Sequence, residues 1–254
     1  ECTCLAVVPI MMQRILALPD EVKSKYDLSS LRITAASGSA LPGHLATEWM
    51  DAFGDNLYNF YGSTEVAMAT VATPEDMRAA PGTAGKPPLG TVVKILDPQG
   101  QALPDGETGR IFVSNAISFE GYTSGDDKER LAGLVSSGDV GHFDEGGRLF
   151  VDGRDDDMIV SGGENVFPRE VEDLIASRDD VEEVAVVGVR DPEWGQRLKA
   201  FVVPKPGAAP TEAAIKAQVK EALASYKVPR EVAFLEALPR NATGKVLKRN
   251  LGTG

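Results

Sequence analysis

The chain has 254 residues, 43% of them hydrophobic, and a formal net charge of −12. This length is enough for one large or two modest domains with a sizeable core. The negative charge argues against a nucleic-acid-binding protein, which needs a basic surface to meet phosphates, and weakly against attachment to an anionic membrane.

Cysteine content and hydropathy suggest a compartment. Cys2 and Cys4 are the only cysteines and make a poor disulfide pair, so we expect a reducing, cytoplasmic setting. No apolar run approaches about 18 residues, so no membrane-spanning helix is expected, although peripheral membrane contact stays open. The sequence opens at Glu1 inside an apolar, periodic pattern without methionine, which we interpret as the cut end of a longer chain.

Strands and helices are expected to alternate from Cys4 to Phe60. In chain order, we expect a strand at Cys4–Val8, a helix from Pro9, a strand at Leu31–Ala36, a helix from Pro42 at its first position to Phe53, and a strand at Asn56–Phe60. This alternation predicts a parallel sheet, whose ligands bind at the carboxyl ends of the strands. The turn Ser37–Ala40 and the loop Tyr61–Glu65 are expected at that edge.

The pattern changes twice further along the chain. Short β runs at Val92–Leu96, Gly109–Ser114 and Arg148–Val151 predict a small antiparallel sheet or β-barrel. After a charged stretch, we expect a strand at Met158–Ser161, a helix at Pro168–Ile175, strands at Val184–Val189 and Ala200–Val203, and a helix at Glu212–Ala224. This last segment has its own core positions, so we place a domain boundary at Arg154–Asp157.

The loop sequence YGSTE, Tyr61–Glu65, has the chemistry of a phosphate site. Thr64 can hydrogen-bond a phosphate oxygen, Glu65 is a hard oxygen ligand suited to Mg²⁺, and Tyr61 can stack on a flat base. The alternative is a strand-to-helix turn in which a hydroxyl caps the helix.

Two acidic stretches follow. In SSGD, Ser136–Asp139, a carboxylate placed after glycine in a loop can accept both hydroxyls of a ribose, but it can equally be a β-turn aspartate. Arg154 and the three aspartates after it can form a solvated face or, at a domain boundary, a hinge that stays hydrated in several orientations.

Two glycine-containing stretches stand in the last third of the chain. Ser161–Asn165 contains a two-glycine turn that lets backbone approach a ligand, or simply a β-hairpin turn. Thr243-Gly244-Lys245 presents a lysine, a strong point charge for carboxylate or phosphate oxygens, although most such lysines are solvated surface residues. The full phosphate-loop spacing GxxxxGK[ST] is absent.

The order of these motifs is more specific than any one of them. They occur as YGSTE, SSGD, GRDDDMIVSGGENVFPREVE, WGQRLKAFVV and LPRNATGKVLKR. This order closely resembles the adenylate-forming (acyl-activating, AMP-binding) superfamily over essentially the whole chain, and SGGENVFP looks most like fatty-acyl- and aryl-CoA ligases. The resemblance implies the C-terminal part of a large adenylation domain at residues 1–154, with an α/β sheet to about residue 80 and a β-barrel at about 82–152. A small, mobile α+β lid domain would follow at residues 155–254.

The resemblance also assigns roles to matching positions. The implied nucleotide-binding residues are Gly38, Ser39, Ala40, Tyr61, Gly62, Asp139 and Arg154. The implied catalytic residues are Lys245, Glu65 and Thr64, with Glu65 also a ligand of Mg²⁺. Asp156 is implied to be the hinge, and Gly163, Glu164 and Trp194 would face coenzyme A.

The implied activity is an ATP-dependent, AMP-forming acid–thiol ligase of fatty-acid or aryl-acid metabolism. A carboxylate would react with ATP to give acyl-AMP, and coenzyme A would then take the acyl group. A Ser/Thr/Gly-rich phosphate loop ending in Pro-Lys-Gly, typical of the family, is not found in this sequence, so we expect a fragment that is inactive alone. Two alternatives remain: a ligase that passes the acyl group to a carrier protein, and a non-catalytic nucleotide-binding module of the same fold.

Overall fold

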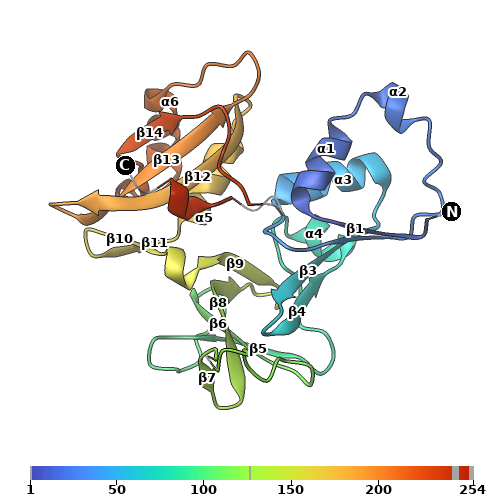
Figure 1. Ribbon diagram of the computed structural model, residues 1–254, viewed down its shortest axis with the longest axis horizontal. Coiled ribbons are helices and arrows are strands. Elements are labelled where there is room, and N and C mark those ends of the chain that lie inside the picture. Colours follow the sequence, from blue (N-terminus) through green and yellow to red (C-terminus); the bar gives the residue numbers. More distant parts are fainter. Residues whose placement is uncertain (1, 126, 242–245, 252–254) are drawn as a thin grey trace. The chain divides into compact units, whose positions relative to one another are not determined.

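The computed structural model describes residues 2–125, 127–241 and 246–251 (Figure 1). The chain divides into two compact units, Glu1–Val151 and Asp152–Gly254. The sequence-based boundary, after Arg154, lies three residues further along than this division.

The first sheet of the first unit runs in the order β1-β2-β3-β4. Its strands are β1 (Cys4–Val7), β2 (Ile33–Ala36), β3 (Leu57–Ser63) and β4 (Ala67–Ala72). The first three are parallel, as the strand–helix alternation predicts, whereas β4 returns antiparallel to β3. The sheet is therefore mixed, with a hairpin at its β3 end.

Helices cover one face of this sheet. They are α1 (Pro9–Leu16), α3 (Gly43–Phe53) and α4 (Pro74–Ala79), with the short α2 (Asp20–Lys23) between α1 and β2. Met12, Leu45 and Trp49 pack with alternate strand residues into one buried cluster, which fixes the sheet against its helices. Pro42 is the N-cap of α3 in an extended conformation, and the prediction that it begins the helix is wrong by one residue.

The second sheet of this unit contains β5 (Val92–Leu96), β6 (Gly109–Ser114), β7 (Arg130–Leu131), β8 (Leu134–Phe143) and β9 (Leu149–Arg154). The strands β5, β6, β8 and β7 pair antiparallel in that order, and β9 also pairs with β8. Ile111, Val113 and Leu149 lie in its core. This sheet is the predicted small antiparallel segment.

The second unit is built on a long hairpin of β12 (Val181–Asp191) and β13 (Gly195–Pro204). A short hairpin of β10 (Ile159–Ser161) and β11 (Glu164–Val166) joins β13, and β14 (Glu231–Phe234) pairs parallel to it. The helices are α5 (Pro168–Ala176) and α6 (Glu212–Ala222), and the 3-10 turns are η1 (Asp155–Asp157), η2 (Ser225–Lys227) and η3 (Lys248–Asn250).

Both faces of this sheet are covered. Val186, Ala200 and Val202 face α5 and α6, whereas neighbouring strand residues face a second cluster. That cluster includes Leu238 and Leu251 from the C-terminal segment, which crosses the face that the helices leave open. The predicted α+β character of this unit is confirmed.

Two motif placements differ from the sequence prediction. The loop expected at Tyr61–Glu65 is wrong, because β3 continues through Ser63 and turns back into β4. The loop expected around Asp139 is also wrong, because Ser136–Asp139 lies inside β8. None of the helices in the described part of the chain is long and apolar enough to cross a membrane.

Candidate functional site

The turn after β2 lies beside the end of β3. The Ser37 hydroxyl donates to the Phe60 carbonyl at 3.0 Å, which ties the two strand ends together. Gly38 has a φ of +86°, a conformation that favours glycine. Ser39 and Ala40 are exposed, so this turn of small residues lies at the surface beside the end of β3.

The β3–β4 hairpin presents the YGSTE residues. A Cβ on Gly62 would lie 1.9 Å from the Ala67 carbonyl oxygen, so glycine is required by the close approach of the two strands. Thr64 is exposed at the turn, where a hydroxyl can meet a ligand oxygen. The backbone N–H of Glu65 donates to the Ser63 hydroxyl at 3.3 Å.

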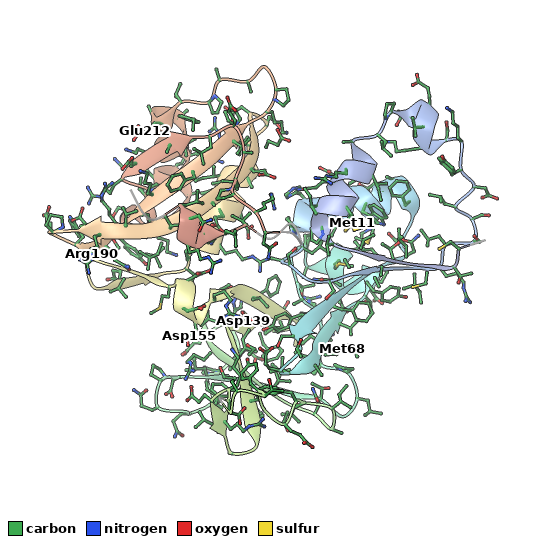
Figure 2. All side chains as sticks on the ribbon, in the orientation of Figure 1. Met11, Met68, Asp139, Asp155, Arg190 and Glu212 are labelled. Carbon is green, nitrogen blue, oxygen red and sulfur yellow. The ribbon has the colours of Figure 1, made fainter. Side chains whose placement is uncertain are left out.

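Tyr61 brings the first two motifs together. Its phenol donates a 2.6 Å hydrogen bond to Oδ2 of Asp139, which is 78 residues further along the chain. Asp139 sits on β8 (Figure 2), where its backbone N–H donates to the Ser137 hydroxyl at 3.1 Å. Ser137 itself donates to the Ile111 carbonyl on β6. The Ser137 hydroxyl thus pairs with one backbone N–H and one backbone carbonyl. This pairing allows the polar sequence SSGD to lie within a strand rather than in a loop.

Sequence analysis missed Tyr122, which contacts the expected metal ligand. The Tyr122 phenol donates to Oε1 of Glu65 at 2.5 Å. This hydrogen bond, followed by that of Ser63, holds the pKa of Glu65 below its ordinary value, and the same contact raises the pKa of Tyr122. The Phe119 N–H donates to the Glu65 carbonyl, so the segment after β6 is bonded to the hairpin. Tyr122 belongs to no periodic pattern in the sequence, so sequence analysis could not identify it as a partner of Glu65.

Glu65 has the chemistry of a single protein ligand for a hard cation. Its carboxylate is ionised at neutral pH and is half-buried at the hairpin. Within the described residues, no group of three or more metal-ligating side chains gathers anywhere. One half-buried carboxylate is a donor set that fits Mg²⁺ completed by waters and nucleotide phosphates.

The aspartate run lies near the start of the second unit. Arg154 ends β9, and its Nε donates to Oδ1 of Asp156 at 3.0 Å. Asp155–Asp157 form η1, in which Figure 2 labels Asp155. Asp156 is exposed, so its side chain stays hydrated next to its arginine partner.

The SGGE residues form the tight β10–β11 hairpin. A Cβ on Gly162 would lie 2.3 Å from Cε3 of Trp194, whose indole covers the turn. The Gly162 N–H also donates to the Trp194 carbonyl at 3.0 Å. The Arg230 guanidinium lies 5.1 Å from the centre of the Trp194 ring. The structure thus brings together two predicted coenzyme-A-side elements, the hairpin with Gly163 and Glu164, and Trp194.

Lys245 lies outside the described residues, together with Thr243 and Gly244. Its flanks are described: Arg240 and Val246 form a β-bridge, and the Leu247 N–H donates to the Pro239 carbonyl at 2.8 Å.

The chain thus contains an α/β unit, in which Tyr61 contacts Asp139, and a smaller α+β unit that carries the glycine hairpin. Residues 1–123 match the family described as "AMP-binding enzyme", and residues 170–245 match "AMP-binding enzyme C-terminal domain". The chain belongs to this adenylate-forming family, as the order of its motifs predicts.

Two curated relatives are ligases by name. The 2-succinylbenzoate–CoA ligase of Geobacillus kaustophilus is 40% identical, over 99% of this chain and 51% of that protein. The fatty acid–[acyl-carrier-protein] ligase ScoC of Streptomyces coeruleorubidus is 34% identical, over 98% and 49%. The ATP-bound structure of MatB from Rhodopseudomonas palustris superimposes with a TM-score of 0.91 at 32% identity, over 99% of this chain and 50% of that one. The chain thus spans about half the length of these relatives.

Proposed function

We propose that the polypeptide containing this chain is an AMP-forming ligase that joins a fatty or aryl carboxylic acid to coenzyme A. The contact between Tyr61 and Asp139 supports this most directly, because two motifs that the family resemblance assigns to the nucleotide lie together in the first unit. One relative is named for an aryl acid, 2-succinylbenzoate, and another for fatty acids. We therefore include both acid classes in the proposal.

In the first half-reaction, an oxygen of the substrate carboxylate attacks the α-phosphorus of ATP. The bond from that phosphorus to the bridging oxygen breaks, and pyrophosphate leaves with the electron pair. In this proposal Tyr61 lies against adenine, Asp139 accepts the ribose hydroxyls with help from Arg154, and Thr64 contacts the α-phosphate. The turn Gly38–Ala40 and Gly62 line the nucleotide.

Two charged groups would stabilise the transferring phosphoryl group. Mg²⁺ held through Glu65 would neutralise phosphate charge when bound. Lys245 would bridge the substrate carboxylate and the phosphate, where a positioned cation stabilises the charge that develops in the transition state.

In the second half-reaction, the thiol of coenzyme A attacks the acyl carbon of acyl-AMP, the thiol proton is lost and AMP leaves. The Gly163–Glu164 hairpin and Trp194 would face this step. Rotation about the hinge at Asp156 would exchange Lys245 for the hairpin between the two half-reactions.

The acyl acceptor has one alternative, which a named relative favours. The name of ScoC gives an acyl-carrier protein, rather than coenzyme A, as the acyl acceptor. Incubating the complete polypeptide with ATP, Mg²⁺ and a panel of fatty and aryl acids, with either coenzyme A or a carrier protein, separates the two. We expect AMP and acyl-CoA by mass spectrometry, and acylated carrier protein without acyl-CoA would refute the coenzyme A assignment.

A further inference from the structure

Glu172 on α5 links two parts of the second unit that are distant in sequence. Its Oε1 accepts the Val186 N–H at 2.6 Å and the Lys248 ammonium at 2.8 Å. The Glu172 side chain is only 17% exposed and that of Lys248 27%. This ion pair is thus more sheltered than an ordinary surface pair, whose worth is small.

The Val186 contact shows why a carboxylate stands there. Within the described residues, β12 pairs with β13 alone and forms the edge of its sheet. Because the Val186 N–H is directed to Glu172, it points away from β13. A backbone N–H at the edge of a sheet needs an acceptor, and the Glu172 carboxylate is that acceptor. The same carboxylate is negatively charged and also pairs with the Lys248 ammonium.

A second ion pair holds the other flank of the same C-terminal segment. Glu183 on β12 accepts from Arg240 at 2.5 Å, with side-chain exposures of 23% and 30%. Arg240 is bridged to Val246, and Leu251 is buried against the same sheet. Residues 241–245 are therefore flanked on one side by Arg240, fixed to Glu183, and on the other by Lys248, fixed to Glu172.

We propose that Glu172 and Glu183 are positioning residues for the first half-reaction, acting as an ionic clamp on the two flanks of the segment that contains Lys245. This inference rests on the proposed adenylating function of that lysine. Neither glutamate is required to touch substrate. Each pairs with a basic residue that stands within five positions of Lys245 in the sequence; Glu183 belongs to β12, and Glu172 is hydrogen-bonded to β12 through Val186.

The clamp predicts a selective effect. A misplacement of about 1 Å at a reacting group can cost about 100-fold in rate, whereas the acyl-transfer step does not use Lys245 in this proposal. Weakening the clamp should therefore lower the rate of adenylation and spare thioester formation from acyl-AMP supplied in the assay.

The test uses Glu172→Gln, Glu183→Gln and the double variant in the complete polypeptide. Glu170→Gln is the matched control, because Glu170 lies on the same helix and pairs with Lys227, away from the C-terminal segment. We expect the double variant to lose about 10- to 100-fold in kcat for ATP–pyrophosphate exchange. Thioester formation from supplied acyl-AMP should stay within about threefold, as should both activities of the control.

A double-mutant cycle isolates the contact. Glu172→Gln and Lys248→Met should be non-additive, because each removes the same ion pair. Hydrogen exchange of the 246–251 segment should quicken in the clamp variants while exchange in β13 stays unchanged, which separates local release from unfolding.

Three outcomes would overturn the clamp: equal loss of both half-reactions, additive single losses, or clamp variants that behave like Glu170→Gln. A wild-type protein without exchange activity would instead refute the proposed function itself. In that case the hydrogen-exchange comparison still decides whether the two glutamates hold the segment.

Discussion

Alanine at Gly162 should destabilise the β10–β11 hairpin more than alanine at the neighbouring Gly163. Gly162 has a φ of +62° and Gly163 a φ of +88°, so alanine at either position costs about 1–2 kcal/mol for the left-handed backbone. Only Gly162 also meets a neighbour, because its Cβ would lie 2.3 Å from Cε3 of Trp194, whereas a Cβ on Gly163 has nothing within 4 Å.

The extra destabilisation in Gly162→Ala comes from displacement of the Trp194 indole. Trp194 is 38% exposed, so the ring can shift outward rather than distort the strands. Displacing it forfeits the contact with the Arg230 guanidinium, worth about 0.5–1 kcal/mol at an exposed site. Residual overpacking adds about 1 kcal/mol. Gly162→Ala should therefore destabilise the second unit by about 1.5–2 kcal/mol more than Gly163→Ala does.

Hydrogen exchange of the buried amides in β13, followed by mass spectrometry, reports the opening free energy of the second unit in every variant. Trp194→Ala supplies the control: in that background, Gly162→Ala should cost no more than Gly163→Ala. Equal losses for the two glycine variants in the wild-type background would refute the inferred packing of the indole on the hairpin.

Three further predictions concern charged groups. Tyr122→Phe should raise the pKa of Glu65 toward its ordinary value, since the phenol O–H stabilises the carboxylate; an unchanged carbon NMR titration of that carboxyl would contradict the contact. Lys245→Ala should lower adenylation by about 100- to 1,000-fold, and a loss of tenfold or less in steady-state assays would exclude its catalytic role. The Arg178 hydrogen bond lowers the pKa of Asp180, so its stabilisation is present above about pH 4 and fades as the pH falls through the lowered pKa. In Asp180→Asn, the free energy of unfolding should therefore fall less steeply as the pH is lowered below about 4. The same acid dependence in the variant and the wild type would contradict a stabilising Arg178–Asp180 pair.

Local patterns predicted the elements whose signals are local. Pro9 and Pro168 begin the helices expected from them, and Val92–Leu96 and Gly109–Ser114 have the predicted strand bounds. The short, mostly apolar run Ala67–Ala72 forms β4, a strand that the sequence analysis does not predict, and this is why the YGSTE residues are expected there in a loop. Its strand signal was present in the sequence.

Contacts between distant residues were beyond local reasoning. The Tyr61–Asp139 and Tyr122–Glu65 hydrogen bonds span 78 and 57 residues, and no spacing rule connects such pairs. The serines of SSGD are typical of turns, yet the Ser137 hydroxyl lies within a buried strand and donates to the Ile111 carbonyl on β6. The motif order therefore predicted the family, whereas the partners of the motif residues required the fold.

The most direct measurement of the central claim is acid-dependent exchange of radiolabelled pyrophosphate into ATP, without a thiol acceptor, by the complete polypeptide and by the chain as printed. We predict exchange by the complete polypeptide with at least one fatty or aryl acid, and little exchange by the printed chain, which has no recognisable phosphate loop. Folded complete polypeptide that exchanges nothing with any acid of the panel would contradict the ligase assignment and every catalytic role derived from it.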